Sequence, residues 1–175
     1  MHDSHAPAPV PHIQRVGIRD FPFQQAILLE ECHCYDADIL QQYYKGSAVF
    51  LLATVARTYL TDVLEEGPGA EGSLTGFLVS DVGRDEDLEV YGVLKNLAVS
   101  CAEDSPEIIR AALIRRWQEE CRQELWDGLR ASVSPVQEAD RAAFLQECFS
   151  SLGTCPCCES ELLQWWSDAE QPRAL

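Results

Sequence analysis

Eight cysteines in 175 residues are the side chains best suited to chemistry in this chain, and five of them lie in two short clusters. Cys32 and Cys34 flank a histidine, and Cys155, Cys157 and Cys158 lie around a proline. Cys155 and Cys158 have the C-x₂-C spacing with which two thiolates reach one zinc ion. Three interpretations follow: reduced thiols without a ligand, a structural zinc or other thiophilic metal ion if the fold joins the two clusters, and a redox pair in the second cluster.

The compartment expected for these thiols is a reducing one. Residues 1–11 lack the basic and then apolar plan of a signal peptide, and the alternating alanines and prolines there predict a short disordered leader. A cytoplasmic protein without disulfides is therefore expected. Cys101, Cys121 and Cys148 lie singly in apolar or amphipathic stretches, where a free cysteine packs as a small hydrophobic side chain.

Carboxylates are the other candidates for chemistry. Glu89 lies in a long apolar stretch and Asp81 in the stretch before it. Either would serve as a general base if burial raised its pKa toward neutrality. Both lie near the polar ends of these stretches, so the alternative is two solvated surface carboxylates. The four histidines are too scattered for a catalytic dyad, and neither a dinucleotide-binding nor a P-loop glycine motif occurs.

The charge balance restricts the partners. Twenty-nine carboxylates against 13 lysines and arginines leave a formal net charge of −16. A surface this acidic repels nucleic-acid phosphates and anionic lipid headgroups, so neither a nucleic acid nor a membrane is an expected partner. No apolar run approaches the roughly 18 residues of a membrane-spanning helix. The expected partners are a small amine or another protein.

Periodicity predicts one domain at 12–166, followed by a polar tail at 167–175. The expected order is a strand, two short helices, three consecutive strands, a long helix, a strand, a helix and a final strand. The ranges are 12–19, 20–32, 36–44, 47–57 with an extension to 65, 74–82, 88–99, 105–128, 129–133, 135–149 and 161–166.

This order predicts an α/β fold with a mixed β-sheet and helices on both faces. Three consecutive strands favour antiparallel pairing in the middle of the chain, and the strand–helix–strand succession at the end favours parallel pairing there. The second cysteine cluster is expected in a loop. Trp165 and Trp166 in the last strand must point to opposite faces of the sheet, one into the core and the other toward a partner or a second subunit.

Three stretches resemble the GNAT N-acetyltransferase superfamily. The run VLKNLAVS at 93–100 resembles the family's fourth strand, which leads through a phosphate-holding loop into a long third helix. The runs LRASVSP at 129–135 and AFLQECF at 143–149 resemble its fifth strand and fourth helix. The resemblance covers roughly residues 12–166, rests on element order and apolar pattern, and implies a GNAT-like fold.

The resemblance also implies acetyl-CoA as cofactor and acyl transfer to an amine. The cofactor-binding residues that it implies are Leu97, Val99, Ser105 and Arg110. The splayed fourth and fifth strands would hold the acyl group. Glu89 or a water molecule would take the proton of the attacking amine.

The sequence departs from the family pattern at the phosphate-holding loop. The family uses Gln/Arg-x-x-Gly-x-Gly/Ala, whose backbone N–H groups cradle a diphosphate. Here Asp104 replaces the first residue, Pro106 lacks an N–H, and Glu107 adds negative charge. Without the family, this stretch is an ordinary capped helix start. Phe144 also falls where the family commonly has a tyrosine as general acid.

The sequence thus leaves three functions open. The first is a divergent acyl-CoA-dependent N-acyltransferase. The second is a catalytically inactive GNAT-like domain that acts as a protein-interaction module. The third is a small domain stabilised by a metal ion at the cysteine clusters, which is compatible with either of the others.

Overall fold

The computed structural model describes residues 10–29, 36–55, 74–100, 103 and 105–167. Most of the predicted leader, the extension at 58–65 and most of the tail lie outside these ranges, as do Cys32, Cys34, Cys101 and Asp104. Pro11, predicted to end the leader, instead begins the first strand. Within the described residues, the strands are β1 (Pro11–Val16), β2 (Val49–Val55), β3 (Leu74–Arg84), β4 (Val90–Val99), β5 (Gly128–Val133), β6 (Ser150–Thr154) and β7 (Glu161–Trp166). The helices are the 3-10 helix η1 (Ile18–Asp20) and the α-helices α1 (Phe23–Leu29), α2 (Ala37–Tyr43), α3 (Pro106–Gln123) and α4 (Glu138–Gln146).

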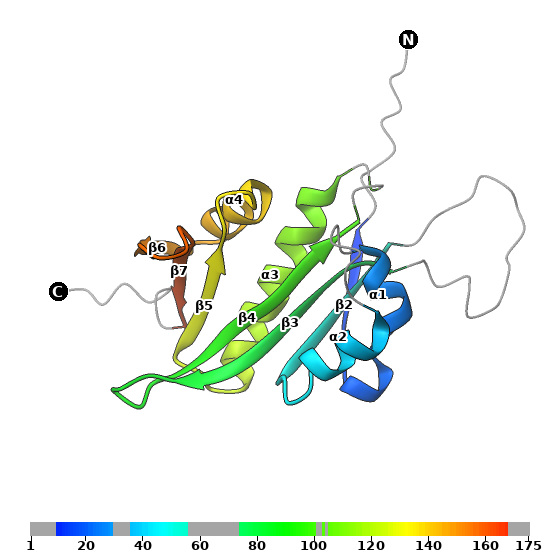
Figure 1. The fold of residues 1–175 in the computed structure, drawn as a ribbon, viewed down its shortest axis with the longest axis horizontal. Helices are drawn as coiled ribbons and strands as arrows, with labels where there is room; N and C mark the ends of the chain where they lie inside the picture. The colour runs from blue at the N-terminus through cyan, green and yellow to red at the C-terminus, as the bar shows by residue number, and fades with distance from the viewer. Residues whose placement is uncertain (1–9, 30–35, 56–73, 101–102, 104, 168–175) are drawn as a thin grey trace, which may run out of the picture.

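The strands form one mixed sheet in the order β1-β2-β3-β4-β5-β7-β6 (Figure 1). Each of the strands β1 to β4 pairs antiparallel with the next. Strand β4 pairs parallel with β5, and helix α3 connects these two strands in the chain. The predicted mixed sheet is therefore confirmed, but the predicted parallel pairing of the last two strands is wrong, because β5 and β7 are antiparallel. The cause is β6, which precedes β7 in a hairpin and reverses the chain. All five residues of β6 are exposed, so no buried periodicity marks it in the sequence.

Helices cover both faces of the sheet, as predicted. Helices α3 and α4 pack on one face around Trp117 and Phe144, and α1 and α2 pack on the other around Phe21 and Tyr44 (Figure 1). Each face has its own cluster of buried apolar side chains, because alternate strand residues point to opposite sides. Across the described ranges, no helix is both long and apolar enough to cross a membrane.

Helix α3 begins where the sequence predicts and ends earlier. Pro106 occupies the first turn, where its missing N–H costs no helical hydrogen bond. The helix stops at Gln123, and Leu125 turns the chain with a φ of 58°. Gly128 therefore starts β5 rather than ending α3. A Cβ at this position would lie 2.3 Å from the carbonyl oxygen of Trp165, so the close approach of β7 requires glycine.

The single cysteines and the paired tryptophans test two packing predictions. Cys121 is fully buried in the α3 core, as expected. Cys148 is exposed, against expectation, because the chain leaves α4 there with a left-handed φ of 70°. Trp165 is 2% exposed and Trp166 is 42% exposed, which confirms that they point to opposite faces.

A buried carboxylate ties the edge strand β1 to helix α3. Glu120 is only 2% exposed, and its two oxygens accept hydrogen bonds from Arg15 Nη1 at 2.7 Å and from Arg116 Nε at 2.9 Å. Arg15 also pairs at 2.9 Å with Glu124, which lies near the surface. Residues about 105 positions apart in the chain are joined in this way, so the cluster is a tertiary and not a local interaction.

Candidate active site between β4 and β5

The parallel strands β4 and β5 stay paired over only part of their length. Their register runs from Tyr91↔Gly128 to Val93↔Arg130, whereas β4 continues to Val99 and β5 to Val133. The two strands diverge beyond the last pair, toward their carboxyl ends, so that their backbones form a V (Figure 1). We call this arrangement the β4–β5 V.

A bulge in β4 lies at the point of divergence. Val79 pairs with Asn96 and Ser80 with Leu94, so Lys95 is the unmatched residue of β4. A bulge bends its strand and increases the local twist. Because Lys95 follows closely after the last residue that pairs with β5, the bulge accounts for the separation of the two strands.

Peptide groups of β4 line the β4–β5 V. The N–H of Ser100 donates to the carbonyl of Thr75 on the β3 side at 2.8 Å. Along an antiparallel ladder, residues alternately bond to the partner strand and point away from it. The N–H and C=O groups of Val99 and Leu97 therefore point away from β3, toward β5. Both residues were implied as cofactor-binding, and the structure brings them together at the open part of the V.

The amino end of α3 lies at the open end of the V, directly after β4 in the chain. Ser105 occupies the capping position, as predicted, but its side chain makes no capping hydrogen bond. Pro106 contributes no N–H there, and Glu107 places a carboxylate in the first turn.

Arg110 is engaged by an acidic side chain of a neighbouring helix. Its Nε lies 2.8 Å from Oδ1 of Asp140 on α4, and both side chains are less than a fifth exposed. Because α3 follows β4 and α4 follows β5, this ion pair bridges the two helices beside the open end of the V. The charge of Arg110 is thus largely balanced within the protein.

Glu89 lies at the other end of the sheet, in the hairpin between β3 and β4. Tyr91 donates a hydrogen bond to its carboxylate. Burial of Tyr91, followed by this hydrogen bond, raises the pKa of the phenol above its ordinary value. Ten residues separate Glu89 from Val99, or roughly 30 Å along a strand. The structure does not bring Glu89 to the open end, and Asp81 is paired with Lys95 at 3.2 Å.

The fold was compared with known proteins. No family model matches the chain, and no curated protein sequence matches it. Among solved structures, it resembles a chain of the NatC complex bound to Gag peptide and CoA, at TM-score 0.63 and 12% identity over 88% of this chain and 95% of that one. It also resembles the ribosomal-protein-S18-alanine N-acetyltransferase of Escherichia coli, at TM-score 0.58 and 13% identity over 88% and 90%. A GNAT family acetyltransferase of Elizabethkingia anophelis with acetyl-CoA bound gives 0.57 and 14% over 90% and 98%.

This chain has the GNAT fold. The seven-stranded mixed sheet and the four α-helices match those structures over nearly their whole length, which confirms the resemblance seen in the sequence. At this level of identity the likeness concerns the fold and leaves the substrate open.

The described residues of this GNAT fold fit the amide-bearing arm of an acyl-CoA better than its diphosphate. The peptide groups of Leu97 and Val99 offer donors and acceptors to the amide-bearing arm of such a molecule. Pro106 and Glu107 suit a diphosphate poorly, since one lacks an N–H and the other carries like charge. Phe144 is fully buried against Trp117 and Phe149, so at this position the fold holds a core side chain.

The turn between β6 and β7 gathers the second cysteine cluster. The Sγ atoms of Cys155, Cys157 and Cys158 all lie within 4.8 Å of one another, and those of Cys155 and Cys157 are 2.9 Å apart. The thiol of Cys157, together with the backbone N–H groups of Cys157 and Cys158, lowers the pKa of Cys155 to about 7.

The described elements next to the two cysteine clusters belong to different parts of the sheet. Cys32 and Cys34 lie outside the described residues, and the helices on either side of them, α1 and α2, pack over β2 and β3. The second cluster lies beside β6, the opposite edge strand (Figure 1). A single site that uses both clusters stays a prediction, because it depends on Cys32 and Cys34.

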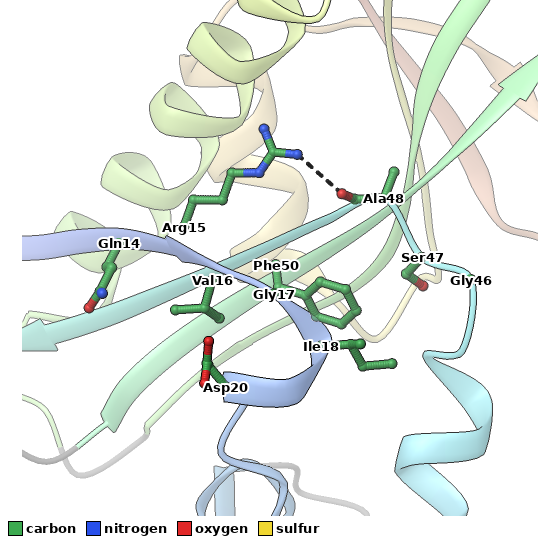
Figure 2. A pocket seen from close by; sticks show the side chains of 10 residues that line it. All are labelled: Gln14, Arg15, Val16, Gly17, Ile18, Asp20, Gly46, Ser47, Ala48 and Phe50. Atoms are coloured by element: carbon green, nitrogen blue, oxygen red, sulfur yellow. Dashed lines mark hydrogen bonds between the residues drawn. The ribbon is translucent and has the colours of Figure 1, made fainter.

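A surface pocket of about 720 Å³ lies away from the β4–β5 V. Figure 2 shows it between the end of β1 and the turn before β2, with Phe50 and Ile18 on one side and Arg15 donating to the carbonyl of Ala48 at 3.3 Å. Because β2 and β4 run in the same direction, the start of β2 lies toward the closed end of the V. None of the site residues expected from the sequence lines this pocket.

Proposed function

We propose that this protein is an acyl-CoA-dependent N-acyltransferase that transfers an acetyl or similar group to an amine. The observation that carries the proposal is the β4–β5 V, into which the peptide groups of Leu97 and Val99 point. A strand edge that lacks a neighbour binds an extended, amide-bearing molecule as a further strand would. The GNAT fold supports the same reaction class.

Each wall of the V has a part in this proposal. The N–H and C=O groups of Leu97 and Val99 bind and orient the donor, and β5 closes the opposite side. The amino end of α3 faces the open end. The helix dipole attracts an anionic group there, whereas the negative charge of Glu107 repels it. When bound, acyl-CoA would supply a thioester whose C–S bond breaks as the C–N bond to the amine forms, so that CoA leaves as its thiol. Because Glu89 lies at the closed end, solvent water at the open end accepts the proton that the amine loses.

The charge of the chain bears on the acceptor. A formal net charge of −16 concentrates cations near the surface and repels anions. A cationic acceptor, such as a polyamine or a basic peptide, therefore fits better than an acidic one. It reacts through the small fraction of its amine that is neutral at the working pH.

Thermal melting with and without millimolar acetyl-CoA tests the donor site. Binding to the native state raises the melting temperature, by an amount that grows with ligand concentration. Val99→Pro removes the N–H that points into the V without removing a bond to β3, and should weaken the affinity about two- to tenfold, as expected for one hydrogen bond. Val99→Ala keeps that N–H and serves as the matched control. A folded wild-type protein without any shift contradicts the proposal.

A protein-interaction module without catalysis is the second candidate. Pro106 and Glu107 at the start of α3 favour it, as does the pairing of Arg110 with Asp140. In that case neither acetyl-CoA nor CoA shifts the melting temperature, and no acyl transfer to a panel of polyamines and basic peptides is detected by mass spectrometry. Detection of an acylated amine in that panel excludes this second candidate.

A further inference from the structure

The turn that carries the second cysteine cluster is closed by its own backbone. The N–H of Cys155 donates to the carbonyl of Ser160 at 2.8 Å, and the N–H of Glu159 donates to the carbonyl of Cys155 at 2.9 Å. Glu159 has a φ of 60°, a left-handed conformation that costs roughly 1–2 kcal/mol for a residue other than glycine. The chain adopts a strained turn here, and this turn places three thiols on one side.

The spacing of the three sulfur atoms suits a single ion. A zinc–sulfur bond of about 2.3 Å in tetrahedral geometry separates two sulfur ligands by roughly 3.8 Å. The three Sγ atoms already lie within 4.8 Å of one another, and those of Cys155 and Cys157 are 2.9 Å apart. Shifts of about 1 Å or less, which side-chain rotation provides, would therefore bring all three to one metal ion.

The surroundings favour a thiophilic ion over an oxygen-bound one. Thiolates select zinc and copper(I), whereas magnesium and calcium take oxygen ligands. Cys157 and Cys158 are exposed and Cys155 is partly exposed, so an ion reaches them directly from solvent. The carboxylate of Glu161, which begins the next strand, pairs with Arg141 at 2.9 Å.

The hairpin itself would gain from such an ion. Strand β6 has no buried residue, and its only hydrogen-bonded neighbour among the described strands is β7. Of the two strands, β7 has buried core residues, whereas β6 is held mainly by its hydrogen bonds to β7. A metal ion at the turn would fix the connection between the two strands.

We propose that Cys155, Cys157 and Cys158 form a three-thiolate site for one thiophilic metal ion, zinc(II) or copper(I), without contribution from Cys32 and Cys34. Zinc would leave a fourth position for water or for a ligand of a partner molecule, whereas copper(I) is satisfied by three thiolates. The site is independent of the β4–β5 V and of the acyltransferase reaction.

Metal titration of the reduced, chelator-treated full chain tests this site. Cobalt(II) is the spectroscopic probe for zinc, because thiolate ligands give it charge-transfer absorption in the near ultraviolet. Copper(I) is titrated separately against a chromophoric chelator. We expect one ion per chain in at least one of these two titrations, and the arm that saturates distinguishes the zinc site from the copper site. Absence of stoichiometric binding in both overturns the proposal.

Cysteine variants locate the ion. Cys155→Ser, Cys157→Ser and Cys158→Ser should each lower the affinity at least about 100-fold, since loss of even a supporting partner costs roughly 10–100-fold. Cys148→Ser, at the exposed single cysteine, and the double variant Cys32→Ser/Cys34→Ser should bind as the wild type does. Circular dichroism confirms that each variant is folded. Unchanged affinity in Cys155→Ser, or lost binding in the double variant, contradicts the assignment.

Discussion

At the scale of single residues, charge at the start of α3 opposes the binding of an anionic donor. Glu107 lies in the first turn, where the helix dipole stabilises one negative charge, either of a ligand or of a side chain. A bound anion and the carboxylate of Glu107 repel each other. Arg110, the nearest arginine along the helix, is held by Asp140. The affinity for a diphosphate at this position is therefore set by a few side chains that substitution can change.

Glu107→Gln should raise the affinity for acetyl-CoA about two- to fivefold, which corresponds to the roughly 0.3–1 kcal/mol of a charge at a helix end. Isothermal titration measures the change. Glu119→Gln makes the same charge change on the exposed side of α3, roughly 18 Å further along the axis, and should leave the affinity nearly unchanged. Equal effects of both variants would show that only the net charge matters.

The thiol of Cys155 should react at lower pH than an ordinary cysteine. Its pKa is lowered to about 7, first by the thiol of Cys157 and then by backbone N–H groups. A lowered pKa means that the reactive thiolate predominates above about pH 7 and is lost below it. Alkylation of chelator-treated protein, followed by peptide mass spectrometry, should show this midpoint, and Cys157→Ala, which removes the hydrogen-bonding thiol, should raise it. A midpoint for Cys155 near 9 contradicts the expectation.

At the scale of elements, the pairing of β4 with β5 decides where the V closes. Gly92 pairs with Leu129, and a Cβ on it would lie 2.6 Å from Leu129 Cδ2 and 2.7 Å from the Trp126 ring. Both neighbours are buried, so neither has free space to move into. The strands approach at this point because one of them has no side chain, and they separate beyond the bulge at Lys95.

Gly92→Ala should lower the free energy of unfolding by roughly 1–3 kcal/mol, as expected for overpacking of a closed core. Gly83→Ala is the matched control, because the closest atom to its Cβ is Val93 Cγ2 at 3.6 Å, an ordinary contact. Urea denaturation followed by tryptophan fluorescence measures both. Equal stability of the two variants would mean that β4 and β5 shift apart without cost.

At the scale of the whole molecule, two apolar clusters and one buried ion cluster hold the layers together. The apolar clusters fasten helices to each face of the sheet. The carboxylate of Glu120 on α3 fastens the edge strand β1 through Arg15, and Arg116 of the same helix donates to the carbonyl of Ile13 on β1 at 3.3 Å. This contact adds to the pairing of β1 with β2, since β1 has no fully buried residue.

Glu120→Gln should lower the free energy of unfolding by roughly 1.5–3 kcal/mol, since it weakens two charge-assisted hydrogen bonds of a buried group. Glu124→Gln removes a carboxylate that is 41% exposed and should cost less than about 1 kcal/mol. Chemical denaturation compares the two. A loss in Glu124→Gln as large as in Glu120→Gln would assign the stabilisation to surface charge instead.

Local patterns in the sequence predicted the elements that bury apolar side chains. The range predicted for β4 and the start predicted for α3 agree closely with the structure, because a long apolar run and a proline at the first helical turn are local signals. Leu97 and Val99 followed from the resemblance of the fourth strand. Strand β6 was not predicted, because none of its residues is buried. The predicted direction of β7 relative to β5 was therefore wrong.

Contacts between distant segments decided the rest. The pairing of Arg110 with Asp140 and of Arg15 with Glu120 joins positions 30 and 105 residues apart, which no local spacing reveals. Local spacing does not reveal the β4–β5 V either, because it depends on the pairing register of two strands that are separated in the sequence by α3. Amino-acid order determines which residues favour a helix, a strand or a turn, because those preferences act over a few neighbours. The placement of charges and the opening between strands arise only when the layers pack, because they depend on distances through space.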